Sequence, residues 1–255
     1  DVYKRQLNNI RNIDNPTSGV MKIHILGIGG TFMAGIAIIA KEMGHDVTGS
    51  DTNLYDPMKT VLINNKISFT ENYNSKTLDN KYDLIIVGNV MTRGMDIIEK
   101  LLDKKISFTS GPEWLYDNVL SKKTVIAISG THGKTTTSAL VTHILKYSRK
   151  NPSYLIGGLP IGIKSPAKLT NSEYFVIEAD EYDTAFFDKR SKYLHYHPNV
   201  MVINNIEFDH ADIFENIEAI IKNFHHVLRT MPRSGRVIYN ADDINIRKLI
   251  KKGLW

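Results

Sequence analysis

The segment "TVIAISGTHGKTTTSALV" (124–141) joins an apolar run to a glycine-containing polar turn and then to a pattern typical of a helix. The apolar run predicts a strand at 124–129, and the helix is predicted because its apolar residues recur at helical spacing. These residues, which would share one face of the helix, are Leu140, Val141, Ile144 and Leu145. A turn between a strand and a helix presents backbone N–H groups to an anion. We therefore interpret residues 130–136 as a phosphate-binding loop in an α/β sheet.

The loop differs from the usual P-loop, which has a glycine where this chain has Ile128. We predict that Lys134 neutralises the phosphates of ATP and that the hydroxyl of Thr135 binds Mg²⁺. The alternative is an exposed turn with a solvated lysine, and the flanking strand and helix favour phosphate binding over it. The predicted ATP-binding residues are Gly130, Thr131, His132, Gly133, Lys134, Thr135 and Thr136.

Two acidic clusters follow apolar runs at 174–180 and 200–205 that we predict as strands. Because the carboxyl ends of parallel strands meet at one edge of a sheet, these clusters are expected near the loop. We predict Glu178 as a Mg²⁺ ligand together with Thr135, and His210 as a ligand of a second metal ion. A single acid at a strand end would more often be a solvated carboxylate. For Asp180, Glu181 and Asp209 both interpretations stay open.

A second glycine-rich turn, "ILGIGG" (25–30), ends a predicted strand at 22–26 and opens a helix at roughly 32–43. Its glycines, Gly27, Gly29 and Gly30, would let an anion approach the backbone. Asp51 lies about 20 residues further on, where a ribose-binding acid is expected. Phe32 interrupts the dinucleotide fingerprint, so nucleotide binding is favoured without NAD specificity. The alternative is a tight turn with packing glycines only.

The alternation of strand-like and helix-like segments from Met21 onward predicts parallel sheets flanked by helices. A polar joint near 121–124 separates a Rossmann-like parallel-sheet domain at 21–120 from a P-loop α/β ATP-binding domain at 121–255, which looks truncated. Residues 1–20 are interpreted as a leader, a disordered tail or a non-native segment. Further predicted elements are strands at 45–51, 82–89, 105–111 and 235–240 and a helix at 217–228.

The composition is that of a globular protein and excludes several classes of site. The 255 residues carry a net charge of +5, and no block of Lys or Arg indicates nucleic-acid binding. The apolar runs are too short to span a membrane. Because the chain has no cysteine, it has neither disulfides nor a thiolate metal site, which fits a reducing compartment.

These motifs resemble those of the Mur ligase family, ATP-dependent amide-forming enzymes of peptidoglycan metabolism. "GTHGKTTT", "EADEYD" and "NNIEFDHADIF" are similar to the central domain of that family, and "HILGIGGTFMAGIA" with "GSD" to its uridine-nucleotide-binding domain. Within the family, "GNVMTRG" (88–94), "SGPEWL" (110–115) and "EADEYDTAFFDKRSKYLHYHP" (178–198) look most like the members that attach a preformed tripeptide.

The resemblance implies roles for individual residues. Residues 130–136 would hold ATP, with Thr135 and Glu178 on one Mg²⁺ and His210 on a second. Lys134, Glu178 and His210 would be the catalytic residues, and His132 would contact the muramoyl substrate. The uridine nucleotide would bind at Gly27, Gly29, Gly30 and Asp51.

The resemblance also implies a reaction. ATP would phosphorylate the lactyl carboxylate of UDP-N-acetylmuramate, and the amine of L-Ala-γ-D-Glu-meso-diaminopimelate would attack the acyl phosphate, in cytoplasmic peptidoglycan recycling. No obligate protein partner is implied. Because the third domain of the family is not in this sequence, the fragment alone is expected to be inactive. The alternatives are a ligase adding L-alanine to UDP-N-acetylmuramate, a nicotinamide-dependent oxidoreductase, and a nucleotide-binding module without catalysis.

Overall fold

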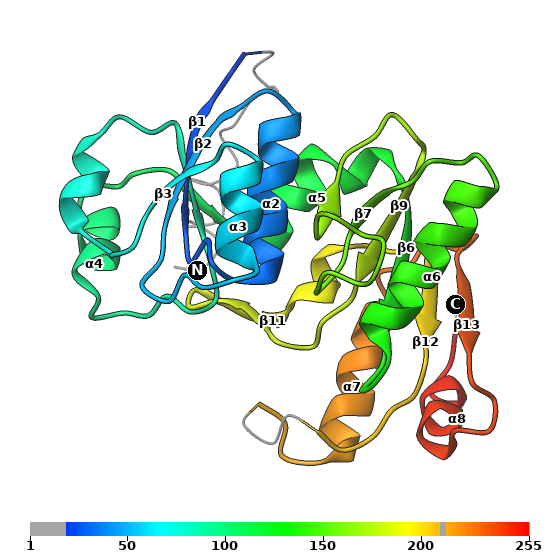
Figure 1. Ribbon diagram of the computed structural model, residues 1–255. Helices are drawn as coiled ribbons and strands as arrows, with labels where there is room; N and C mark the ends of the chain where they lie inside the picture. Colours follow the sequence, from blue (N-terminus) through cyan, green and yellow to red (C-terminus); the bar gives the residue numbers. More distant parts are fainter. Residues whose placement is uncertain (1–18, 210–212, 255) are drawn as a thin grey trace.

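The computed structural model describes residues 19–209 and 213–254, which form two α/β units side by side (Figure 1). The first unit has five parallel strands in the order β3-β2-β1-β4-β5. This order places the carboxyl end of β1 beside those of β2 and β4, which confirms the predicted Rossmann-like sheet. Its elements are β1 (Lys22–Leu26), α2 (Thr31–Glu42), β2 (Asp46–Ser50), α3 (Met58–Asn64), β3 (Ser68–Thr70), the 3₁₀ helix η1 (Ser75–Asp79), β4 (Leu84–Val87), α4 (Asp96–Asp103), β5 (Phe108–Ser110) and α5 (Gly111–Asn118).

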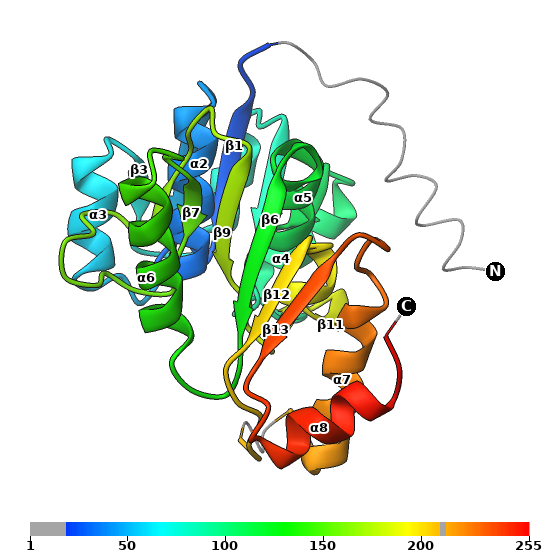
Figure 2. The same ribbon diagram turned by 90° about the vertical axis from the view of Figure 1, so that its right-hand side faces the viewer.

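The second unit has six strands in the order β13-β12-β6-β9-β7-β8, in which only the β7–β8 pair is antiparallel. In Figure 2, α6 covers one face of this sheet and α7 the other. The predicted parallel central sheet is thereby confirmed. Its elements are β6 (Thr124–Ser129), α6 (Lys134–Tyr147), β7 (Ser153–Leu155), β8 (Ala167–Lys168), β9 (Tyr174–Glu178), β10 (Asp183–Ala185), β11 (Asp188–Ser191), the 3₁₀ helix η3 (Lys192–His195), β12 (Val200–Ile203), α7 (Ile217–Leu228), β13 (Arg236–Tyr239) and α8 (Ile244–Lys251).

Helix α2 joins the two units because it packs against the edge of the second sheet as well as the first. At Gly35, an added Cβ would lie 3.1 Å from the side chain of Leu155 and 3.3 Å from that of Ala167, so only a small residue fits there. The carboxylate of Glu42 accepts a hydrogen bond of 2.6 Å from the backbone N–H of Leu169. One buried hydrophobic cluster accordingly contains residues of both sheets. This shared core holds the two glycine turns in a fixed relation to each other.

The predicted domain boundary at 120/121 falls in the 3₁₀ helix η2 (Leu120–Lys122), between the last helix of the first unit and β6. Its position stays a prediction. The segment interpreted as a leader lies outside the described residues, apart from Gly19 and Val20. Among the residues that the structure describes, no helix has the length and apolar character needed to cross a membrane.

The predicted packing face of α6 is wrong for two of its four residues. Leu140 and Ile144 are 56% and 52% exposed. Val141 and Leu145 do pack against the sheet, but the fully buried residues of the helix are Ser138 and Thr142. The helix is therefore rotated so that small polar residues face the sheet, an orientation that hydrophobic periodicity cannot predict.

Gly49 in β2 determines how closely the first glycine turn lies against the sheet. A Cβ at this position would lie 2.7 Å from the Cβ of Ile28, in the turn, and 2.9 Å from the carbonyl oxygen of Ile25. Because the carbonyl belongs to a central strand, it cannot move aside. We expect Gly49→Ala to lower the free energy of unfolding by about 2 kcal/mol, as overpacked cores do, measured by urea denaturation. Gly19→Ala is the control, since its added Cβ meets nothing within 4 Å, and equal stability of the two variants would contradict this packing argument.

Candidate active site

The loop between β6 and α6 has a backbone that requires glycine at two positions. Gly130 has φ +129° and Gly133 has φ +78°, both in the region that disfavours side chains. A Cβ on Gly130 would also lie 3.0 Å from the backbone nitrogen of Asn205, so the loop passes close to the end of β12. Helix α6 begins at Lys134, directly after Gly133. The first amides of such a helix have no intrahelical partners and can bind an anion.

Two asparagines at the end of β12 hold this loop in place, a role that we did not predict. The backbone N–H of His132 donates to Oδ1 of Asn205 over 2.8 Å, and Nδ2 of Asn204 donates to the His132 carbonyl over 3.2 Å. Nδ2 of Asn204 also lies 3.1 Å from Oγ1 of Thr137 in the first turns of α6. The only sequence signal for this role is that both follow a strand next to β6. Their effect is to fix the loop backbone before any ligand binds.

Lys134 lies folded back over the loop. Its ammonium donates to the carbonyl of Gly130 over 2.8 Å and to Oε2 of Glu181 over 3.2 Å. The two side chains are 14% and 3% exposed, so this is a largely buried ion pair. Burial raises the pKa of Glu181 above its ordinary value, while the charge of Lys134 acts in the opposite direction. Glu181, whose role the sequence left open, is thus the carboxylate that Lys134 contacts.

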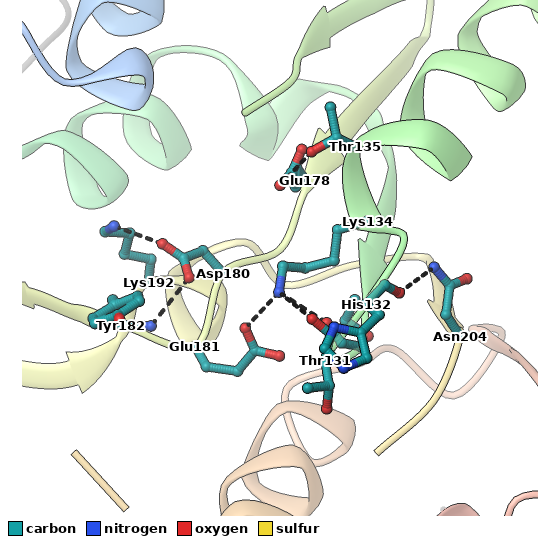
Figure 3. A network of polar contacts seen from close by, with 12 residues as sticks. Thr131, His132, Lys134, Thr135, Glu178, Asp180, Glu181, Tyr182, Lys192 and Asn204 are labelled. Atoms are coloured by element: carbon teal, nitrogen blue, oxygen red, sulfur yellow. Dashed lines mark hydrogen bonds and ion pairs between the residues drawn. The ribbon is translucent and has the colours of Figure 1, made fainter. Parts of the chain in front are cut away.

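Glu178 faces the start of α6, as Figure 3 shows. Its Oε1 accepts a hydrogen bond of 3.2 Å from the hydroxyl of Thr135, and its Oε2 accepts one of 2.8 Å from the backbone N–H of Gly157. A carboxylate and a hydroxyl this close, at the end of the predicted phosphate-binding loop, are the kind of oxygen ligands that Mg²⁺ prefers. The pair therefore fits the predicted first metal site.

The predicted second metal site is only partly covered by the structure. His210, the residue predicted to form it, lies outside the described residues. Within the described ranges, no three His, Asp or Glu side chains are grouped as a metal site. The role of His210 stays a prediction.

Two further loop predictions concern exposed side chains. The imidazole of His132 is 64% exposed, with Nε2 3.7 Å from a carboxylate oxygen of Glu207. Thr136 is exposed in the first turn of α6. Both are accessible to a ligand, and their binding roles stay predictions.

The first glycine turn is braced by Asp51, which is 7% exposed. One carboxylate oxygen accepts the backbone N–H of Gly29 over 2.8 Å, and the other accepts that of Asn53 over 3.0 Å. Asp51 thereby shapes the turn, in addition to the nucleotide contact predicted for it. Helix α2 starts directly after Gly30, with no side-chain cap and no acid in its first turn. The first turn of α2 therefore supplies no negative charge of its own at the positive end of the helix.

Comparison with known proteins is consistent with this architecture. Residues 22–123 match the model described as "Mur ligase family, catalytic domain", and residues 128–253 match "Mur ligase middle domain". The UDP-N-acetylmuramate–L-alanyl-γ-D-glutamyl-meso-2,6-diaminoheptandioate ligase of Escherichia coli is 50% identical over 92% of this chain and 51% of its own length. The UDP-N-acetylmuramate–L-alanine ligase of Clostridium acetobutylicum is 34% identical over 89% of this chain and 48% of its own length.

A solved structure gives the same result. The crystal structure of UDP-N-acetylmuramate:L-alanyl-γ-D-glutamyl-meso-diaminopimelate ligase from Neisseria meningitides has a TM-score of 0.89 at 45% identity, covering 93% of this chain and 76% of the solved one. The chain spans about half the length of the curated relatives it matches. With two family models matched in chain order over the two sheets, this chain belongs to the Mur ligase family, as its motifs predicted.

Proposed function

We propose that this chain carries the nucleotide-binding half of an ATP-dependent ligase that joins UDP-N-acetylmuramate to L-Ala-γ-D-Glu-meso-diaminopimelate. The observation that carries the proposal is a braced phosphate loop with Lys134 at its centre and Glu178 facing Thr135. The choice of tripeptide rests on similarity: the relatives named for that substrate are 50% identical to this chain, and those named for L-alanine are 30–34% identical. The reaction is placed in the cytoplasm, where both nucleotides are available.

The geometry supports a separate role for each side chain of the proposed ATP site. A carboxylate is a poor electrophile, so the lactyl carboxylate is activated as an acyl phosphate before the amine attacks. Lys134 lies where it can exchange its contact with Glu181 for a phosphate oxygen. Thr135 and Glu178 would hold Mg²⁺, which neutralises phosphate charge when bound. Catalysis of this type depends mainly on positioning and charge neutralisation.

The uridine nucleotide is assigned to the first unit. The turn at Gly27, Gly29 and Gly30 is preformed by Asp51 and opens onto the start of α2. We propose that the diphosphate binds where this turn meets the first amides of α2 and that His132 contacts the muramoyl end. The substrate would then extend from the first turn towards the loop of the second unit.

The proposal is tested with the full-length protein, UDP-N-acetylmuramate, ATP and Mg²⁺, offered either the tripeptide or L-alanine. We expect phosphate release and an amide product with the tripeptide, and product formation at least about tenfold slower with L-alanine. Preference for L-alanine would show that the protein instead acts as a UDP-N-acetylmuramate–L-alanine ligase, the name of its other relatives. Nucleotide binding without product from either amine would favour a non-catalytic module. Reduction of a nicotinamide cofactor has no support from either family model.

A further inference from the structure

Lys192 is a nearly buried cation at the junction of the two units, and the mechanism above does not use it. Its side chain is 10% exposed, and its ammonium lies 2.8 Å from Oδ2 of Asp180. The ammonium also lies over two aromatic rings, 5.6 Å from the ring centre of Phe32 and 5.9 Å from that of Tyr182. Phe32 belongs to the first turn of α2, while Asp180 and Tyr182 follow β9. The cation therefore contacts both units.

The position of Lys192 is well defined because the hairpin before it is anchored on the first unit. At the tip of β10–β11, Phe187 packs edge-on against Phe108 of β5, with ring centres 5.1 Å apart. Phe186 packs on the buried cluster formed by β1, β4 and α4. Figure 1 shows β11 reaching beneath the first unit. The backbone N–H of Lys192 is itself bound to the carbonyl of Tyr182 over 3.0 Å.

In the acidic segment after β9, two neighbouring carboxylates form ion pairs with two different lysines. Figure 3 shows Asp180 holding Lys192 on one side, and Glu181 holding Lys134 on the other. Lys192 thus lies between Phe32, beside the proposed uridine-nucleotide turn, and Glu178 and Lys134, at the proposed transfer site. In the proposed function a sugar nucleotide extends from one site to the other, and we place Lys192 beside that path. The sugar nucleotide carries negatively charged oxygens in two places, in its diphosphate and in its lactyl carboxylate.

We propose that Lys192 binds an oxyanion of the sugar-nucleotide substrate, either the diphosphate or the lactyl carboxylate, and that Asp180 holds its ammonium in place until the substrate arrives. This inference rests on the proposed function, because it takes the substrate path from it. Aromatic rings on the ammonium reduce its hydration without neutralising it, which leaves it able to accept an anion. The competing role is purely structural: an ion pair that fastens the segment after β9 to Lys192.

The two roles predict opposite effects of removing Asp180. Binding is measured by calorimetry on the full-length protein in EDTA without ATP, so that the metal site beside Glu178 does not contribute. We expect Lys192→Met to raise the Kd for UDP-N-acetylmuramate by about tenfold or more, as loss of a charge-assisted hydrogen bond does. Asp180→Asn keeps an oxygen that can accept a hydrogen bond from the ammonium but removes the competing negative charge, so the Kd is expected to stay unchanged or fall. Lys192→Arg should restore most of the affinity.

The matched control is Lys189→Met, which removes one positive charge from the β10–β11 hairpin just before Lys192. Lys189 is 69% exposed and pairs with Asp183, so this variant should bind as the wild type does. UDP and UDP-N-acetylglucosamine, which lacks the lactyl group, identify the anion. Weaker binding of all three ligands by Lys192→Met assigns the diphosphate, and weaker binding of UDP-N-acetylmuramate alone assigns the carboxylate.

Two outcomes overturn the inference. In one, Lys192→Met binds UDP-N-acetylmuramate with wild-type affinity. In the other, Asp180→Asn and Lys192→Met both bind UDP-N-acetylmuramate more weakly and both have a lower thermal stability. That result is expected if the ion pair of Asp180 and Lys192 only stabilises the fold. If the wild-type protein does not bind UDP-N-acetylmuramate, the proposed function itself is wrong and this inference falls with it.

Discussion

Replacement of Lys134 by alanine in the full-length protein is expected to abolish ligation while UDP-N-acetylmuramate still binds. The ammonium is held against the proposed phosphate-binding loop, 2.8 Å from the Gly130 carbonyl. Loss of one such electrostatic contact in the transition state lowers turnover by about 10²–10³-fold. The measurement is ATP-dependent phosphate release in the presence of the tripeptide. Binding of UDP-N-acetylmuramate should change by less than about twofold, since the first glycine turn is untouched.

The buried partner of Lys134 makes a second variant necessary. Lys134→Ala leaves the carboxylate of Glu181, which is 3% exposed, without its cation, and breaking a buried pair in this way costs about 3 kcal/mol or more. The double variant Lys134→Ala/Glu181→Gln removes both charges and should recover most of that stability, but no activity. Lys146→Ala on the exposed part of α6 is the control for charge. Turnover near the wild-type rate in the folded double variant would show that Lys134 does not act on the phosphates of ATP, and the assignment of residues 130–136 as a P-loop would be wrong.

The sequence predicted the elements whose pattern is local. The strand at 124–129 and the helix at 217–228 have the predicted bounds, because continuous apolar runs and helical periodicity need no partner to be recognised. The strands β7 and β8, of three and two residues, were missed because they are too short to show a pattern. For Glu178, its place at the end of an apolar run was sufficient to predict a position near Thr135.

The contacts that were not predicted are those that depend on the order of the strands in the sheet. Asn204 and Asn205 reach the loop only because β12 lies next to β6, and Glu181 reaches Lys134 only because β9 lies on the other side. Nothing in a single sequence states which strands become neighbours. The same limit explains Lys192, whose contact with Phe32 joins two units. Asp51 was recognised by its spacing, but its bond to Gly29 depends on the turn geometry.

Replacement of Glu178 by glutamine is expected to weaken Mg²⁺ binding without destabilising the fold. Glutamine has nearly the same shape, its oxygen can still accept the N–H of Gly157, and its amide can donate to the hydroxyl of Thr135. What it lacks is the negative charge and the second acceptor that a divalent cation requires. The Mg²⁺ concentration for half-maximal ligation by the full-length protein should therefore rise about tenfold or more, the size of a lost charged ligand contact.

A binding measurement makes this prediction independent of turnover. In the wild-type protein, Mg²⁺ should tighten the binding of ADP in calorimetry, because Glu178 and Thr135 would hold a cation that neutralises phosphate charge. In Glu178→Gln this gain should be largely lost, whereas binding of ADP in EDTA should stay the same or improve as a negative charge is removed. The control is Glu173→Gln, an exposed acid just before the opposite end of the same strand, which should behave as the wild type does. If both variants keep the full Mg²⁺ effect, Glu178 is not a metal ligand, and its role is limited to holding Gly157 and Thr135.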